Sequence, residues 1–194
     1  MRTKNLFIII SLIFLSGCIS LNPFPFNQSL VGQKIMSEDT IFNNTTTNTD
    51  PYQNLTWIRS PDWVVERFVI SSIPSCVAHL RAATREDVVR FYQLYVWNGS
   101  DKWSFYNRAY DSNGNALGFV LVDREVSKHG YAVHESFAIN LSEKYLNDMR
   151  ISGLNIKVVG KRSEKIIVVP SYFVQGFLRK VNVCIKGMKS REKK

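Results

Sequence analysis

The fold is decided by residues 88–141, which read VVRFYQLYVWNGSDKWSFYNRAYDSNGNALGFVLVDREVSKHGYAVHESFAINL. Apolar runs rich in β-branched and aromatic residues alternate here with clusters of Asn, Gly, Asp and Ser. Asn-Gly between such runs is the strongest short-range signal for a hairpin turn. We therefore expect four strands joined in chain order as an antiparallel meander, at Val88–Trp97, Trp103–Tyr110, Ala116–Val126 and Tyr131–Asn140.

Weaker signals extend this region on both sides. A strand is predicted at Trp63–Ile70 and a hairpin at Leu154–Val159 and Lys165–Val169. The Thr84–Asp87 stretch resembles a helix cap, but no helical face follows it.

Two helices are also predicted. Ser142 can cap one that runs to about Ser152 and ends at Gly153, and Ser171 can cap another after Pro170. Their apolar faces would be formed by Tyr145, Leu146 and Met149 in the first, and by Phe173, Val174, Phe177, Leu178 and Val181 in the second. The expected fold class is α+β, a single small domain with an antiparallel β-meander sheet and two covering helices.

The N-terminus has the layout of an export signal. Arg2 and Lys4 precede an apolar run, Leu6–Leu15, whose ten residues span only about 15 Å as a helix, half of a ~30 Å hydrocarbon core. Leu15-Ser16-Gly17-Cys18 follows, and this stretch resembles the lipobox of bacterial lipoproteins. The resemblance covers residues 1–18 only.

The resemblance implies that the chain is cut before Cys18 and that this cysteine carries a diacylglycerol thioether and an N-acyl chain, enough for stable anchoring. The expected location is the bacterial cell envelope, with the outer membrane facing the periplasm as the preferred site. An ordinary cleaved signal peptide is the alternative. Six Asn-x-Ser/Thr triplets fit the glycosylation pattern of eukaryotic secreted proteins, but fifteen of 194 residues are Asn, so such short matches arise from composition.

The expected organisation has four parts: a signal peptide (1–17), a lipidated N-terminus with a flexible tether (18–55), a globular domain (56–185) and a basic disordered tail (186–194). Cleavage takes two positive charges from the net +9 and leaves +7. Five cations against Glu192 give the tail +4, so the rest of the mature chain carries only +3. This distribution argues against a nucleic-acid-binding face.

The chain lacks the common catalytic and metal-binding motifs, and no cofactor or metal site is expected. Its three histidines, His79, His129 and His134, read as surface or hydrogen-bonded residues. The one remaining hydrolytic hypothesis is a carboxylate cluster across adjacent strands, formed by Asp123, Glu125 and Glu135.

Aromatic residues crowd the strands between Phe91 and Tyr110. Because side chains alternate along a strand, Tyr92 must face away from Phe91, Tyr95 and Trp97. Rings on an uncovered face would form a recognition surface, for which the candidates are Tyr92, Tyr95, Trp97, Trp103 and Tyr106. Coverage of both faces by helices or by the tether is the alternative.

Acylation of Cys18 would leave Cys76 and Cys184 as the only other cysteines. Export permits a disulfide between them, and two buried free thiols are the alternative.

Two function classes follow. The first is a lipid-anchored, non-enzymatic binding or assembly component whose partner is a protein or a cell-wall component. The second is an envelope hydrolase acting on peptidoglycan or glycan. A cleft with two carboxylates of raised pKa would favour the hydrolase, and an aromatic patch or an open sheet edge would favour the binding protein.

Overall fold

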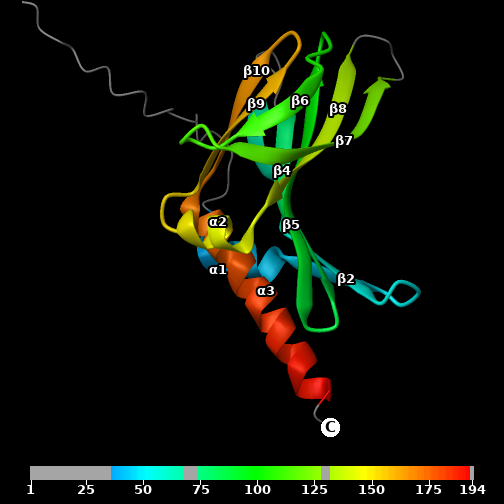
Figure 1. Cartoon of the computed structure of the whole chain (residues 1–194), viewed down its shortest axis with the longest axis vertical. Helices are drawn as coiled ribbons and strands as arrows, with labels where there is room; N and C mark the ends of the chain where they lie inside the picture. The colour runs from blue at the N-terminus through cyan, green and yellow to red at the C-terminus, as the bar shows by residue number, and fades with distance from the viewer. Residues whose placement is uncertain (1–35, 68–73, 128–131, 193–194) are drawn as a thin grey trace, which may run out of the picture. The chain divides into compact units, whose positions relative to one another are not determined.

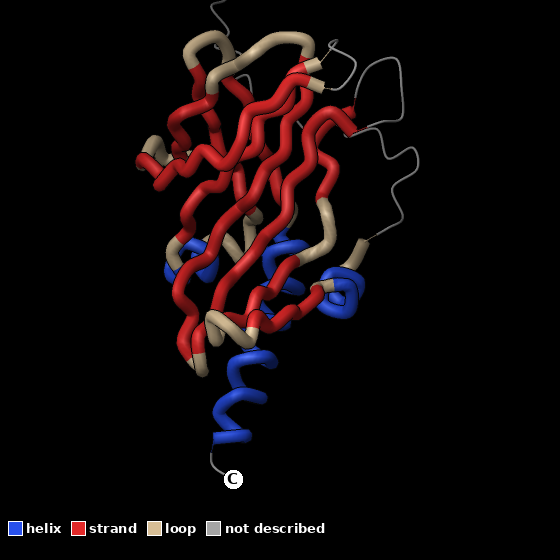
Figure 2. Tube along the Cα trace, turned by 90° about the vertical axis from the view of Figure 1, so that its right-hand side faces the viewer, coloured by secondary structure: helices blue, strands red, loops and turns tan. Residues whose placement is uncertain are grey.

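A computed structural model of the 194-residue chain describes residues 36–67, 74–127 and 132–192, all within one compact unit that begins at Ile35. These residues form ten antiparallel strands in one sheet and three helices (Figures 1 and 2). The strands are β1 (Thr46–Asp50), β2 (Leu55–Arg59), β3 (Trp63–Arg67), β4 (Pro74–Arg85), β5 (Val88–Ser100), β6 (Tyr106–Tyr110), β7 (Ala116–Val126), β8 (Val133–Leu141), β9 (Leu154–Gly160) and β10 (Glu164–Val169). The helices are α1 (Glu38–Asn44), α2 (Glu143–Asp148) and α3 (Ser171–Glu192). The α+β expectation is thus confirmed at the level of class, with the sheet dominant and the helices gathered toward one end of it.

The strand order is β1-β2-β4-β5-β8-β7-β6-β9-β10, with β3 also paired to β4. The predicted meander order is therefore wrong, because β5 pairs with β8 and not with β6. β6, β7 and β8 do follow one another as hairpins, so the order β5-β8-β7-β6 is a Greek-key arrangement.

A buried carboxylate explains the departure from the meander. Glu135 on β8 is 1% exposed, and it accepts hydrogen bonds from the backbone N–H groups of Ser104 (2.8 Å), Phe105 (3.2 Å) and Tyr106 (3.3 Å). Its neighbour Arg124 on β7 donates to Glu135 (3.0 Å) and to the Tyr106 carbonyl (2.9 Å). These hydrogen bonds hold the 101–105 connection against β8 and β7. The chain then enters β6, which lies beside β7 on the side away from β8.

Local turn signals were more accurate than strand order. β7 has the predicted bounds, and the turn before it is held by Asp111, whose Oδ1 accepts from the N–H groups of Asn113 and Asn115. Gly114 adopts φ +83° in this turn, a conformation that favours glycine. The turn predicted at Asn98–Asp101 is wrong in position, because Asn98, Gly99 and Ser100 still pair with β8.

The strand β4 was not predicted as such, although it lies at the centre of the fold. It pairs with β5 along its length and with both β2 and β3 on its other side. The apparent cap at Thr84–Asp87 belongs to the β4–β5 turn, where Glu86 has φ +58°. Of the predicted strand Trp63–Ile70, the part beyond Arg67 lies outside the described residues.

Two helices were predicted and three are found. Ser142 caps α2 by accepting from the Tyr145 N–H, and Gly153, with φ +83°, ends the turn that follows the helix. In α3, Ser171 is the first helical residue and not the cap, since the Phe173 and Val174 N–H groups donate to the Pro170 carbonyl. The predicted apolar face of α3 is confirmed, because all five of its residues are buried.

The third helix, α1, corrects the predicted tether of residues 18–55. Ile41 on α1 is fully buried, and Phe42 lies under Arg179 and Lys180 of α3 at 4.3 and 5.2 Å. Residues Thr46–Asp50, which the tether prediction also included, form the edge strand β1, which is polar because most of its side chains face solvent. Residues 18–35 lie outside the described part, as does the signal peptide.

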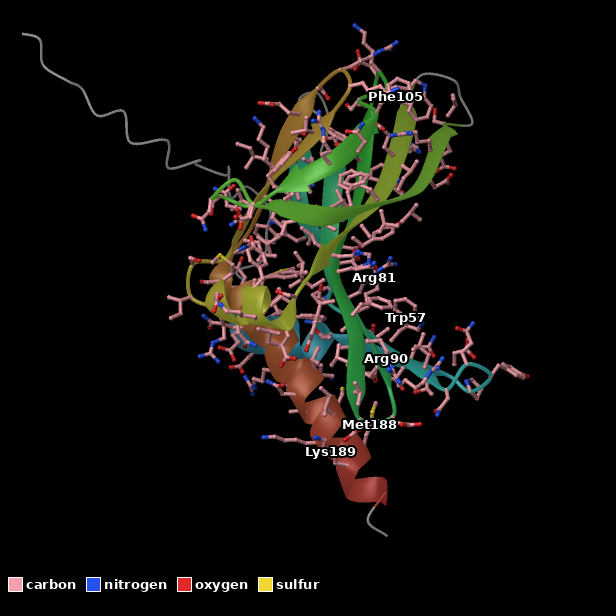
Figure 3. All side chains as sticks on the ribbon, in the orientation of Figure 1. Trp57, Arg81, Arg90, Phe105, Met188 and Lys189 are labelled. Atoms are coloured by element: carbon pink, nitrogen blue, oxygen red, sulfur yellow. The ribbon has the colours of Figure 1, made fainter. Side chains whose placement is uncertain are left out.

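The predicted disordered tail from Lys186 onward is also wrong up to residue 192. α3 continues to Glu192, and its last turns contact the β4–β5 end of the sheet. Met188 lies 3.9 Å from the Thr84 hydroxyl, and Lys189 lies 3.5 Å from Asp87 (Figure 3). Tertiary contacts therefore extend a helix whose sequence has too little apolar content to predict it.

The core is one continuous cluster contributed by the sheet and all three helices. Its largest fully buried side chains include Phe137, Phe173 and Phe177. The sheet curls so that its last strand approaches β3, where the Trp63 indole N–H donates to the Val168 carbonyl (2.8 Å) and Lys165 pairs with Glu66. This packing buries one face of β4 and β5 and leaves the other face available.

Candidate functional site: an arginine–aromatic cleft

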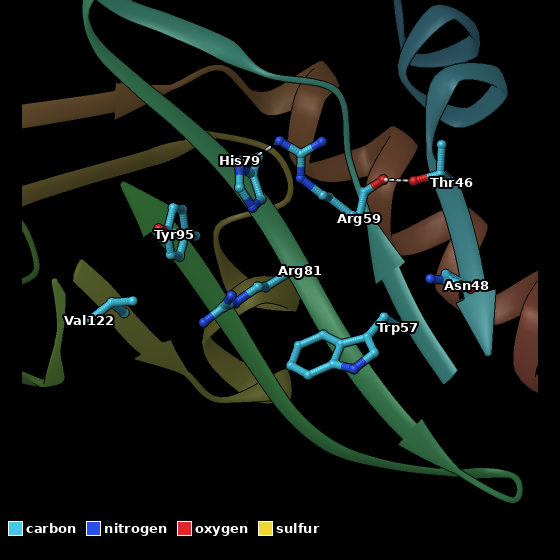
Figure 4. Close-up of a pocket in the computed structure, with 8 residues that line it drawn as sticks. All are labelled: Thr46, Asn48, Trp57, Arg59, His79, Arg81, Tyr95 and Val122. Carbon is cyan, nitrogen blue, oxygen red and sulfur yellow. Dashed lines mark hydrogen bonds between the residues drawn. The ribbon is translucent and has the colours of Figure 1, made fainter. Parts of the chain in front are cut away.

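Alternation along the middle of β4 and β5 separates a core face from an open face. Leu80 and Leu94 face the core and are fully buried, whereas Arg81 and Tyr95 face the other way and are half-buried. On this open face lies a cleft of about 590 Å³ (Figure 4). Its lining consists of Thr46, Asn48, Trp57, Arg59, His79, Arg81, Tyr95 and Val122. We call this feature the arginine–aromatic cleft.

Cross-strand register assembles the floor of the cleft. Arg59, Arg81, Gln93 and Asn140 are direct neighbours across β2, β4, β5 and β8. Arg81 Nε donates to Gln93 Oε1 (2.9 Å), and Gln93 Nε2 donates to Asn140 Oδ1 (2.8 Å). This chain of side-chain hydrogen bonds fixes the Arg81 side chain along the sheet.

Aromatic rings flank this polar row. The Arg81 guanidinium carbon lies 4.7 Å from the Tyr95 ring centroid and 5.5 Å from that of Trp57, within the range of cation–π contacts (Figure 4). Trp57 also meets Phe91 edge to face at 5.4 Å. The two rings can touch because the residue between them on β4 is the small Ala83.

One end of the cleft carries a second, paired arginine. Arg59 Nη2 donates to Asp62 Oδ1 (2.6 Å), and His79 Nδ1 lies 3.3 Å from both of these atoms. In the hydrogen bond between Arg59 Nη2 and His79 Nδ1 (Figure 4) arginine is the donor, because a guanidinium has no acceptor. The polar contact with His79 and the charge of Arg59 hold the pKa of Asp62 below its usual value.

Burial lowers the pKa of His79, and the nearby arginines act in the same direction against the opposing effect of Asp62. The imidazole is therefore neutral at pH 7, and it stacks on Tyr95 at 4.9 Å. The cluster of Arg59, Asp62 and neutral His79 carries no net charge, so Arg81 supplies the net positive charge of the cleft.

The predicted recognition residues separate into three groups. Tyr95 lines the cleft, and Trp97 lies further along the same face of β5, where it packs on His134 at 4.8 Å. Trp103 lies in the 101–105 connection beside Phe105. Tyr92 and Tyr106 are 5% and 2% exposed, so the prediction that they belong to a recognition surface is wrong.

The alternation rule itself is confirmed, since Tyr92 faces the core while Phe91, Tyr95 and Trp97 do not. Sequence reasoning missed Trp57, Arg59 and Arg81 because β2 and β4 were not recognised as strands. An alternation of small apolar residues with His79 and Arg81 along β4 was the only available signal.

The hypothetical carboxylate cluster is not formed. Asp123 and Glu125 are cross-strand neighbours of Ser136 and His134 on the outer face, whereas Glu135 points inward to Arg124. Glu125 lies 3.4 Å from His134 in an exposed contact. The three side chains therefore cannot converge on one bond of a substrate.

The remaining chemistry-bearing residues form no second site. Within the described ranges, no group of three His, Cys, Asp or Glu side chains is arranged to hold a metal ion. Cys76 and Cys184 are free thiols, so the disulfide alternative is not realised in this structure; Cys76 is buried on β4 and Cys184 half-buried on α3. His129 and Cys18 lie outside the described residues. Among the described helices, none has the length and hydropathy needed to cross a bilayer.

No family model, curated protein or solved structure matches the chain. The function is therefore argued from the geometry of the cleft.

Proposed function

We propose that this chain is a lipid-anchored bacterial envelope protein that acts as a non-enzymatic binding or assembly component. The observation that carries the proposal is the arginine–aromatic cleft. It gathers Trp57, Arg81 and Tyr95, residue types that are enriched where proteins recognise partners, on a face that no described element covers.

The cleft supports binding over hydrolysis. A glycan hydrolase of the usual kind needs two carboxylates facing one another across the scissile bond. None of the eight residues lining the cleft is a carboxylate, and the nearby Asp62 is paired with Arg59 and held at a lowered pKa. A general acid requires a raised pKa.

The anchor part of the proposal rests on the Leu-Ser-Gly-Cys sequence at residues 15–18. Its test is intact-mass analysis of the mature chain extracted from membranes. Added lipid mass on Cys18, together with loss of membrane partitioning in Cys18→Ser, supports the anchor. A mature wild-type chain without added lipid mass contradicts it.

The binding part is tested by capture from detergent-solubilised envelopes and by co-sedimentation with purified cell wall. The double variant Trp57→Ala/Tyr95→Ala should fail to bind the envelope or cell-wall components that the wild type retains. Tyr52→Ala is the matched control, because this ring is 97% exposed at the β1–β2 turn and does not line the cleft. Equal retention by the cleft variant and the wild type contradicts a binding role for this face.

A further inference from the structure

The arginine–aromatic cleft contains one charge that no residue in the described part of the chain pairs. A guanidinium has five N–H donors. In Arg81 the Nε donor is taken by Gln93, whereas the four donors on the Nη atoms bond to no residue in the described part of the chain. No carboxylate among the described residues lies within ion-pair distance of Arg81 either.

This arrangement is costly for the free protein. Arg81 is half-buried, and burial lowers its pKa because it disfavours the charged form. A partly desolvated cation is stabilised by an anion with which it can share hydrogen bonds. The neighbouring Arg59 has such a partner in Asp62, so the cleft lacks one negative charge beside Arg81.

The position of Arg81 suits recognition of an oxyanion. Its Nε bond to Gln93 and its contacts with Tyr95 and Trp57 hold the planar fork in place before any ligand arrives (Figure 4). A fixed guanidinium fork matches the two oxygens of a carboxylate or phosphate. Preorganisation of this kind reduces the entropy lost on binding.

The rest of the lining selects the body of the ligand. Trp57, Tyr95 and the neutral ring of His79 offer flat surfaces, while Asn48 on the β1 side offers an exposed amide. The exposed Thr46 hydroxyl donates to the Arg59 carbonyl (3.4 Å) and keeps its oxygen as an acceptor. A volume of about 590 Å³ lies in the range of small-molecule sites. These features fit a molecule with apolar ring faces, several hydroxyl groups and one acidic group.

A peptide fits less well, since peptides on sheets gain affinity from an unpaired backbone edge. The strands β2, β4 and β5 under the cleft each have neighbours on both sides, so their backbone groups are already paired. The open edge at the cleft belongs to β1 at its border, so recognition on the floor of the cleft must use side chains.

From this geometry we infer that the arginine–aromatic cleft binds an acidic saccharide, with its carboxylate or phosphate on the Nη atoms of Arg81 and a sugar ring against Tyr95 or Trp57. The inference rests on the proposed binding function and names the class of ligand that this face would take.

The test is calorimetric titration of the detergent-solubilised, full mature protein with four probes: trigalacturonate, its methyl ester, glucose 6-phosphate and tetraglutamate. Trigalacturonate or glucose 6-phosphate should bind, and which of them binds more tightly assigns the oxyanion to carboxylate or phosphate. The neutral ester should bind at least about tenfold more weakly than the acid, a factor that corresponds to one charge-assisted hydrogen bond. Equal binding of acid and ester, or tetraglutamate binding as tightly as the sugars, overturns the inference.

Two arginine substitutions locate the site. Arg81→Gln should weaken binding at least about tenfold, and Arg81→Lys should restore only part of it, because an ammonium cannot present the planar fork. The control is Arg90→Gln, which removes the same charge from an exposed position near the β4–β5 turn (Figure 3). Arg90 lies an odd number of residues before Tyr95 on β5, so it does not share the position pattern of the cleft residues. This substitution should change affinity less than about twofold. A urea midpoint equal to that of the wild type shows that Arg81→Gln is folded. If Arg81→Gln does not fold, the affinity of Arg81→Lys is compared with that of the wild type instead. Unchanged affinity in a folded Arg81 variant overturns the inference.

Failure of this inference and failure of the proposed function are distinguishable. If no sugar probe binds while Trp57→Ala/Tyr95→Ala still loses envelope capture, the cleft is a binding site for another class of ligand. If capture is unaffected by that variant, the proposed function itself fails.

Discussion

Removal of the buried Glu135 carboxylate by Glu135→Leu should destabilise the fold by about 4 kcal/mol. Its oxygens are the acceptors for the N–H groups of Ser104, Phe105 and Tyr106, and a leucine of similar length leaves these donors without a partner. Each buried donor left unpaired costs about 1–3 kcal/mol. Ser104 and Tyr106 are buried and count in full, whereas Phe105 is half-buried and can reach water. Arg124 loses its partner too, but it is 27% exposed and can be rehydrated in part.

The measurement is urea unfolding of residues 18–194 carrying Cys18→Ser, monitored by tryptophan fluorescence. A loss of about 4 kcal/mol is a large share of the 5–15 kcal/mol that holds a typical domain together. The matched control is Glu125→Leu, which removes a 62% exposed carboxylate from β7 and should change stability by less than about 0.5 kcal/mol.

A double substitution separates the loop-holding role of Glu135 from a simple ion pair. Replacing both partners of a buried ion pair by apolar residues often restores the stability lost by removing one. Here Arg124→Met/Glu135→Leu should be no more stable than Glu135→Leu, because the backbone donors of residues 104–106 remain unpaired. A single-variant loss below about 1 kcal/mol, or recovery in the double variant, would refute this reasoning.

Three further predictions concern other parts of the fold. Gly176→Ala should lower the free energy of unfolding in urea by about 1–3 kcal/mol, since its Cβ would lie 2.5 Å from the Glu38 carbonyl oxygen. Gly187→Ala is the control and should not destabilise the protein, because nothing lies within 4 Å of the added Cβ. Equal effects of the two substitutions would mean that α1 does not pack on α3. Because burial lowers the pKa of His79, this imidazole binds a proton more readily in the unfolded chain than in the folded one. Wild-type stability should therefore fall as the pH drops from about 6.5 through the lowered pKa. His79→Gln should flatten this part of the plot of urea midpoint against pH, and an unchanged slope contradicts the assignment. Burial raises the pKa of Cys76 to about 12, so iodoacetamide should not modify Cys76 until the chain unfolds. Mass spectrometry should show that the half-buried Cys184 is labelled first. Early labelling of Cys76 argues against its burial on β4.

The elements that sequence predicted well are those specified by neighbouring residues. The turn at residues 111–115 is made by the side chain of Asp111 and by the positive φ of Gly114, and both act within five residues. Ser142 caps α2 through an N–H three residues away. Side-chain alternation likewise put Tyr92 and Tyr95 on opposite faces of β5, although it did not predict which face is buried.

Elements that depend on distant contacts were predicted poorly. Nothing near Glu38–Asn44 distinguishes a helix from a linker; Ile41 and Phe42 are ordered by α3, more than a hundred residues later. The same holds for the end of α3, which is supported by Thr84 and Asp87. A short helix with an apolar face is stabilised only when the surface on which that face packs is present.

The sequence by itself determined the strand-rich class, the turn at residues 111–115, the β9–β10 hairpin, which aromatic residues of β5 share a face, and the candidate lipid-attachment sequence at Cys18. Only the tertiary structure decided that β5 pairs with β8, an arrangement in which Glu135 of β8 accepts a hydrogen bond from the 101–105 connection. It also decided the site, since Trp57, Arg81 and Tyr95 come from three strands and meet only when the register of β2, β4 and β5 is fixed. Turn chemistry and alternation act over a few residues, whereas strand partners and register are selected by the free energy of the whole packed domain.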